Sequence, residues 1–102
     1  MTKKIKVADL PDFDMAEELK TEEDIAIYLT LVLEENDSAE LLHALKTVAR
    51  ARGMTEVARA SGVTREALYK ALRPTSQPRF DTIMKVMQAM GLQISVQPVT
   101  HT

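Results

Sequence analysis

A sharp turn between two short helices is predicted within residues 54–72, which read MTEVARASGVTREALYKAL. Gly62 can adopt the positive φ angle that a chain needs where a helix stops abruptly. Thr55 and Thr64 each stand where a hydroxyl can accept a hydrogen bond from the first turn of a helix, so we expect Thr55 to cap the first helix and Thr64 the second. The segment therefore predicts a helix-turn-helix.

The apolar residues of these two helices indicate which sides face a core. In the first helix, Val57, Ala58 and Ala60 form a small apolar face. In the second helix, apolar residues at the spacing i, i+3 and i+4 must face inward, which leaves the charged and aromatic side chains outside. The inward residues are Leu68, Ala71 and Leu72, and the outward residues are Arg65, Glu66, Tyr69 and Lys70.

The outer face of the second helix has the chemistry of a surface that reads DNA. A recognition helix enters the major groove with its N-terminal residues against base edges, and Arg65 stands there with a guanidinium that suits O6 and N7 of guanine. Glu66 could accept from a cytosine amino group, and Tyr69 and Lys70 lie one turn further on. The alternative is a plain helical corner whose Arg65 and Glu66 are solvated surface charges.

Further hydrogen-bond donors precede and follow this pair of helices. The loop RPTSQPRF at residues 73–80 is fixed by two prolines and carries side chains that can donate to phosphate oxygens, although it could also be a simple polar connector. Two arginines stand just before the first helix. The predicted DNA-binding set is Arg50, Arg52, Thr55, Thr64, Arg65, Glu66, Tyr69, Lys70, Arg73, Ser76 and Arg79.

Charge is divided unevenly along the 102 residues. Residues 1–45 carry four lysines against twelve carboxylates, a net charge of −8, whereas residues 46–85 carry nine lysines and arginines against three carboxylates, a net charge of +6. The net charge of −2 for the whole chain argues by itself against nucleic acid. Residues 46–85, which we call the basic block, contain the predicted helix-turn-helix. The charge of this part of the chain therefore favours DNA as a partner.

Composition excludes several classes of protein. The chain has no cysteine, and its two histidines, His43 and His101, cannot form a metal cluster alone, so neither a metal nor another cofactor is expected. No apolar run can span a bilayer or serve as a signal peptide, so we expect a cytoplasmic protein with no membrane partner. No histidine, lysine or metal set is spaced to work with the carboxylates, so an enzyme is not expected.

Before the helix-turn-helix, the sequence predicts three helices. Asp14 with Glu17, and Thr21 with Asp24, have the spacing of capping boxes, and Asp37 or Ser38 can cap a helix that ends near Arg52 at Gly53. The inner stripe of that third helix is Leu41, Leu42, Leu45, Val48 and Ala49, with His43, Lys46 and Arg50 outside.

The run IAIYLTLVL at residues 25–33 would also suit a buried strand, but its capped acidic start favours a helix. Ile27 and Leu31 fall outside its main stripe, so this helix is apolar nearly all round and buried on two sides. The second side either meets another chain or lies in the protein's own core. The main stripe is Ile25, Tyr28, Leu29, Val32 and Leu33.

After the loop, a last helix is expected from about Phe80 to Gly91, with Phe80, Ile83, Met84, Met87 and Met90 toward the core. In residues 92–97 Leu92, Ile94 and Val96 alternate with polar residues, which predicts a half-buried strand. That strand must pair either with the segment around Ile5–Val7 or with another subunit.

Three segments carry a family resemblance: FDMAEELKTEEDIAIYL, LLHALKTVARARGMTEVARASGVTREALYKAL and, after the loop, FDTIMKVMQAMGLQISV. In this order and at this spacing, over about residues 13–97, the sequence resembles the addiction-module antidote family, the small HigA-like antitoxins. The resemblance implies a phage-repressor-like helix-turn-helix, repression of the antitoxin's own operon, and neutralisation of a cognate RelE-like toxin, usually an mRNA-cleaving ribonuclease. Ser61 departs from the wider repressor class, where a larger apolar residue is common, and its hydroxyl is expected to bond to a preceding carbonyl.

The expected fold is mainly α, a phage-repressor-like helix-turn-helix bundle of about five helices with a short C-terminal β-strand. Residues 1–20 are expected to form an N-terminal arm and residues 21–102 a single compact DNA-binding domain. The leading hypothesis is a homodimeric antitoxin whose partners are double-stranded operator DNA and a cognate toxin. A stand-alone phage-type repressor, which the neighbouring gene would distinguish, and an interaction adaptor that does not bind DNA are the alternatives. The salt dependence of DNA binding distinguishes the adaptor from the two DNA-binding hypotheses, since binding through phosphates weakens steeply as salt rises.

Overall fold

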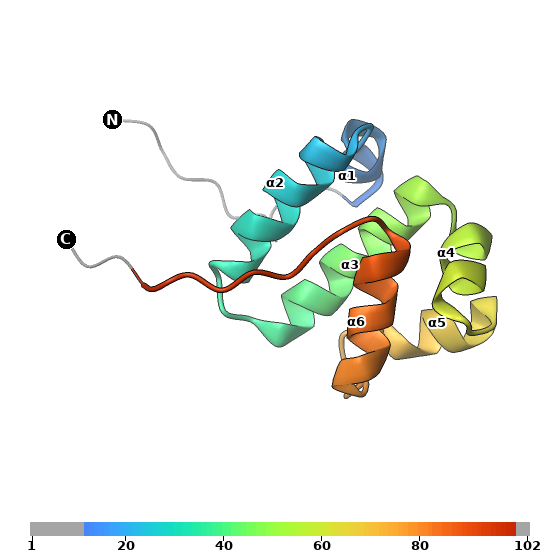
Figure 1. Cartoon of the computed structure of the whole chain (residues 1–102). Coiled ribbons are helices and arrows are strands. Elements are labelled where there is room, and N and C mark those ends of the chain that lie inside the picture. The colour runs from blue at the N-terminus through green and yellow to red at the C-terminus, as the bar shows by residue number, and fades with distance from the viewer. Residues whose placement is uncertain (1–11, 100–102) are drawn as a thin grey trace.

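The computed structural model describes residues 12–99, which form six helices and an extended C-terminal segment (Figure 1). The mainly helical class is confirmed. The predicted C-terminal strand is wrong, because residues 92–99 are extended but form no sheet with any other described part of the chain. The segment around Ile5–Val7, one of the two expected partners of that strand, lies outside the described residues. The helices are α1 (Asp12–Glu18), α2 (Glu22–Leu33), α3 (Ser38–Arg52), α4 (Met54–Ser61), α5 (Arg65–Ala71) and α6 (Phe80–Ala89).

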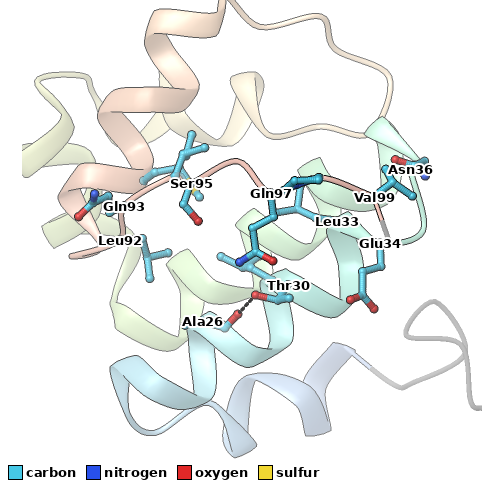
Figure 2. Close-up of a pocket in the computed structure, with 14 residues that line it drawn as sticks. Ala26, Thr30, Leu33, Glu34, Asn36, Leu92, Gln93, Ser95, Gln97 and Val99 are labelled. Carbon is cyan, nitrogen blue, oxygen red and sulfur yellow. Dashed lines mark hydrogen bonds between the residues drawn. The ribbon is translucent and has the colours of Figure 1, made fainter. Parts of the chain in front are cut away.

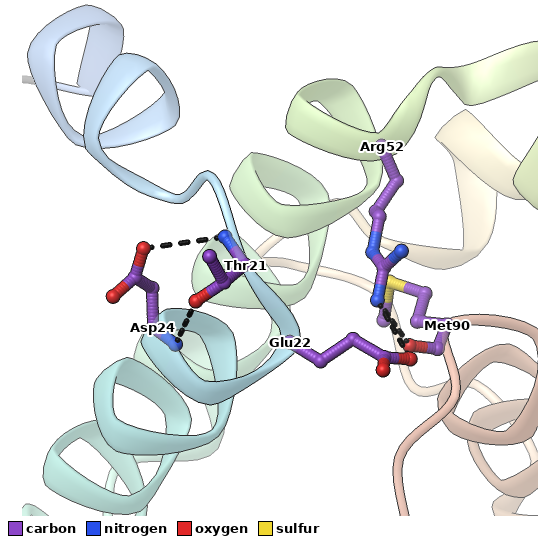
Figure 3. Close-up of polar contacts among 5 residues, drawn as sticks. All are labelled: Thr21, Glu22, Asp24, Arg52 and Met90. Atoms are coloured by element: carbon purple, nitrogen blue, oxygen red, sulfur yellow. Dashed lines mark hydrogen bonds and ion pairs between the residues drawn. The ribbon is translucent and has the colours of Figure 1, made fainter.

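A capping box starts α2, as the sequence predicts. The Thr21 hydroxyl accepts from the amide of Asp24 at 3.0 Å, and the Asp24 carboxylate accepts from the amide of Thr21 at 3.2 Å (Figure 3). The three carboxylates of its first turn also face the positive end of the helix dipole. These local interactions explain why the β-branched run that follows is helical.

The central helix is α3, against which α1, α2 and α4 all pack. Asp37 caps its start by accepting from the amides of Ala39 and Glu40 at 3.0 and 3.3 Å, and the helix ends at Gly53. Its inner residues recur at helical spacing and supply the middle of the core. The buried residues of α3 are Leu42, Ala44, Leu45, Thr47, Val48 and Ala49.

The turn between α4 and α5 has the predicted form. Gly62 takes a left-handed conformation with φ of 76°, and Thr64 caps α5 by accepting from the amide of Ala67 at 3.0 Å. Leu68 and Leu72 are fully buried, which fixes α5 on the core. The outward residues Arg65, Glu66 and Lys70 are exposed.

At the start of α4, the predicted cap is wrong. The helix begins at Met54 with Gly53 as its N-cap, and no side chain caps it. Thr55 is therefore already inside the first turn, where it is exposed. Met54 takes the preceding position because its side chain is buried in the core, an arrangement that the capping signal alone does not reveal.

The predicted apolar face of α4 also needs a correction at one position. Ala60 is exposed, and Ser61 is buried beside Val57 and Ala58. The Ser61 hydroxyl donates to the carbonyl of Val57 at 2.6 Å, which confirms the bond expected for it. A serine can therefore occupy this core position because its polar atom is satisfied by the helix itself.

The last helix, α6, packs against α4. Val86 and Met87 of α6 are buried, as is Met90, which follows its last residue. Phe80 was expected in this core but is 72 % exposed, because the first residue of α6 lies outside the packed part of the helix. Leu33, expected in the main stripe of α2, is 48 % exposed at the end of that helix for a similar reason.

The extended segment after α6 runs back across α2 toward the turn between α2 and α3 (Figure 1). Between this segment and α2 lies a groove of about 630 Å³, shown in Figure 2. Among the residues that line this groove, Glu34 alone is ionisable, so its walls offer no acid-base pair. No helix within residues 12–99 is both long and apolar enough to cross a lipid bilayer.

Candidate nucleic-acid interface

A cationic cluster forms around Tyr69, where α3 and α5 meet. The Arg65 guanidinium carbon lies 5.7 Å from the centroid of the Tyr69 ring, and Nζ of Lys46 on α3 lies 5.9 Å from it. Both distances are within the range of cation-π interactions. The ring is half-buried and packs against the hydrophobic core. Tyr69 therefore holds one positive charge from each of two helices near a fixed aromatic surface.

The pKa of the Tyr69 phenol is lowered in this cluster, which indicates the sign of the local potential. A hydrogen bond from Arg65 lowers the pKa of Tyr69 most, partial desolvation of the ring raises it, and the charges of Arg65, Arg50 and Lys46 lower it further. A place that stabilises a phenolate has a positive potential. The same potential favours other anions with acceptor oxygens, including phosphate groups.

Several residues of the predicted DNA-binding set either belong to this cluster or are exposed on one of its two helices. Arg50 on α3 is exposed and close enough to Tyr69 to lower the pKa of its phenol. Arg65 and Lys70 are exposed on α5. Lys46 was not in the predicted set. It stands one turn before Arg50 on the outer side of α3, and this i, i+4 spacing of two cations is the signal that could have found it.

Arg52, by contrast, has its guanidinium in a structural junction. Its Nη2 donates to the carbonyl of Met90 at 3.0 Å and lies 3.2 Å from Oε2 of Glu22 (Figure 3). Gly91 follows with φ of 75°, and a Cβ atom there would collide with the Glu22 carboxylate. This junction ties α3 to the start of α2 and the end of α6, so the Arg52 guanidinium already has partners within the protein.

The loop between α5 and α6 contains one residue whose side chain bonds to the backbone and two exposed arginines. The Ser76 hydroxyl donates to the carbonyl of Ala71 at 2.6 Å and so satisfies a carbonyl at the end of α5. Nε of Arg79 lies 3.3 Å from Oδ1 of Asp81, although the Arg79 side chain is 85 % exposed. Arg73 is also exposed. The loop therefore keeps two arginines that can meet a ligand.

This chain is thus a small helical protein built around a helix-turn-helix corner, with a cationic cluster on the outer side of the second corner helix. The family model described as "probable addiction module antidote protein" matches residues 9–98, and the chain belongs to that family. An uncharacterized protein of Haemophilus influenzae is 51 % identical over 88 residues, which cover 86 % of this chain and 91 % of the relative. No solved structure was found to match. Family membership supports an antitoxin role, with a toxin as partner.

Proposed function

We propose that this protein is the DNA-binding antitoxin of a type II toxin-antitoxin module, which represses its own operon and neutralises a RelE-like ribonuclease toxin. The antitoxin role is supported by family membership. The observation that carries DNA binding is the cationic cluster around Tyr69, because it joins Lys46 and Arg50 of α3 to Arg65 of α5 on the exposed side of the helix-turn-helix.

In this proposal, α5 enters the major groove in the manner of phage repressors. Arg65, the first residue of α5, meets a base edge, where its planar guanidinium can pair with guanine. Lys46, Arg50 and the loop arginines meet phosphate oxygens on either side, because contacts to the backbone set the register of a recognition helix without reading sequence. Glu66 rejects phosphates and accepts only where a cytosine amino group is present.

The proposed assembly is a homodimer in the cytoplasm, without a cofactor and without catalytic activity of its own. Two-fold symmetry would present two copies of α5 to DNA. The operator should then be an inverted repeat with half-sites separated by about 34 Å, one helical turn, or by a multiple of it. Sedimentation of the chain with and without a candidate operator measures this directly, and a monomer in both cases would contradict it.

Replacing the two kinds of arginine separately tests the DNA-binding part of the proposal. Arg65→Ala should cost about 1–3 kcal/mol on the operator and relax the preference at one base position, since a bidentate pair with guanine discriminates by that amount. Arg79→Ala should weaken binding to all sequences alike and lower the salt slope by about one. Binding isotherms on operator and scrambled duplexes at several salt concentrations supply the measurement.

Glu66→Ala is the control for sequence reading in the same assay. Loss of its negative charge should tighten binding to the scrambled duplex and loosen the choice of sequence. If Arg65→Ala and Arg79→Ala weaken binding to both duplexes by the same factor, α5 does not read bases and the assignment of the interface fails. Toxin neutralisation is measured in a separate assay, so the result of the DNA-binding test does not decide the antitoxin part of the proposal.

A further inference from the structure

One face of α2 is apolar at its centre and is not covered by any other part of residues 12–99. Ile27 and Leu31 stand one helical turn apart and are 54 % and 46 % exposed. Neither residue lines the groove beside the C-terminal segment. The opposite side of α2 supplies Ile25, Tyr28, Leu29 and Val32 to the core, so the core formed by the described residues does not explain the second apolar side.

Carboxylates stand at both ends of this exposed stripe. Glu23 precedes Ile27 by one turn, Glu34 follows Leu31 by three residues, and both glutamates are exposed. We call Glu23, Ile27, Leu31 and Glu34 the outer face of α2. No lysine or arginine occurs in α2, and residues 12–40 carry eleven carboxylates against one lysine. The outer face therefore combines an apolar centre with a strongly negative surrounding.

A second copy of this chain does not fit the outer face. In an antiparallel two-fold pairing of α2 helices, Glu23 of one copy would oppose Glu34 of the other, and in a parallel pairing each glutamate would oppose its own counterpart. Like charges placed against each other at an interface are unfavourable. A partner with lysines and arginines around an apolar patch would instead be complementary to both the centre and the ends of the face.

We infer that the outer face of α2 is the docking surface for the toxin, a basic protein that presents an apolar patch ringed by cations. The inference rests on the proposed function, because a ribonuclease must be basic to hold RNA. Burying Ile27 and Leu31 supplies the stable part of the contact, and the glutamates accelerate association and set the orientation. The two helices α2 and α5 lie well apart in Figure 1, so toxin and DNA would use separate surfaces.

The test measures binding of the full chain to the purified toxin encoded beside its gene. Ile27→Ser combined with Leu31→Ser removes the apolar centre at unchanged charge and should speed dissociation about tenfold. Glu23→Gln combined with Glu34→Gln should slow association at low salt several-fold and weaken its salt dependence. The matched control is Glu17→Gln combined with Glu18→Gln on α1, two exposed residues with the same change of charge, which should alter both rates by less than about twofold.

Circular dichroism should be unchanged in all three double variants, and none of them should bind the operator less tightly than the unmodified chain, which separates a lost contact from a lost fold. If the unmodified chain binds toxin and the α2 variants bind it equally well, the docking surface is wrong while the proposed function stands. If the unmodified chain fails to neutralise the toxin, the proposed function falls and the inference with it. If Ile27→Ser with Leu31→Ser converts a dimer to a monomer in sedimentation, the outer face belongs to a second copy and the inference is overturned.

Discussion

Tyr69 contacts charges that belong to two different helices, and this explains why one uncharged residue is central to the candidate interface. The half-buried ring is fixed by the core, whereas Arg65 and Lys46 on long flexible side chains are not. Contact with the ring restricts both cations to positions beside it. Less side-chain entropy then remains to be lost when a ligand binds.

A titration tests the contact between Arg65 and Tyr69. Since the hydrogen bond from Arg65 favours the phenolate, Tyr69 should ionise below the ordinary value of about 10, and Arg65→Ala should raise its pKa toward that value. The ultraviolet absorbance of phenolate follows the ionisation, with Tyr69→Phe used to subtract Tyr28. Because the folded-state pKa is lowered, any gain in folding stability appears only at alkaline pH and is lost as pH falls through that pKa. An unchanged curve in Arg65→Ala would show that this hydrogen bond does not lower the pKa.

Arg52 forms an ion pair between helices, whereas Arg59 forms one within a single helix, and we expect the two pairs to differ in their effect on stability. Arg52 joins two other helices through Glu22 and a backbone carbonyl, whereas the Arg59 pair with Glu56 lies within α4 and is largely exposed. Arg52→Ala should therefore lower the free energy of unfolding by about 1 kcal/mol and leave the salt slope of DNA binding unchanged. Arg59→Ala should change stability by less than about 0.5 kcal/mol. Urea unfolding measures both, and equal effects would contradict the structural role of Arg52.

At the scale of the helix, two threonines in similar sequence contexts have different roles. Thr64 caps α5, but Thr55 lies inside the first turn of α4 without capping it. Thr64→Ala should destabilise the protein by about 1 kcal/mol, since the amide of Ala67 loses its partner. Thr55→Ala should be neutral or slightly stabilising, because alanine is the better helix former. Similar losses for both substitutions would show that the helix start assigned to α4 is incorrect.

The elements that the sequence predicted well are those whose signals are local. Capping residues such as Thr21, Asp37 and Thr64 bond to amides two or three residues away, so the starts of α2, α3 and α5 could be read from spacing alone. The periodic apolar residues of α3 and the turn at Gly62 were equally local. These signals were sufficient for the helical class and for the helix-turn-helix corner.

The features that local signals misjudged or did not reveal depend on distant partners. The alternation in residues 92–97 is real, but a strand exists only when another strand supplies hydrogen bonds, and Val96 is 93 % exposed instead. Phe80 follows the helical period of α6 but stands beyond the part that packs. The partners of Arg52 lie thirty or more residues away on either side, so its placement in a junction could not be read from the basic block around it.

At the scale of the whole molecule, charge is separated between two helical regions. The region of α1 and α2 is acidic, whereas α3, α5 and the loop after α5 carry the cationic cluster and the exposed arginines. An acidic region attached to a DNA-binding surface repels the phosphate backbone over distances comparable to the Debye length, about 8–10 Å at physiological salt. The free protein should therefore bind DNA less tightly than its cationic cluster alone would allow.

Covering the acidic region with a basic toxin should remove this repulsion. We predict that the antitoxin-toxin complex binds the operator more tightly than the free antitoxin, by about tenfold at low salt, and that the difference disappears at high salt because it is electrostatic. Binding isotherms with and without saturating toxin, at several salt concentrations, measure the effect. Glu23→Gln combined with Glu34→Gln provides a control without toxin, because removing two negative charges should tighten DNA binding slightly and with the same salt dependence. Competition between toxin and operator for the antitoxin would instead mean that both bind the surface around Tyr69, which contradicts separate sites on α2 and α5.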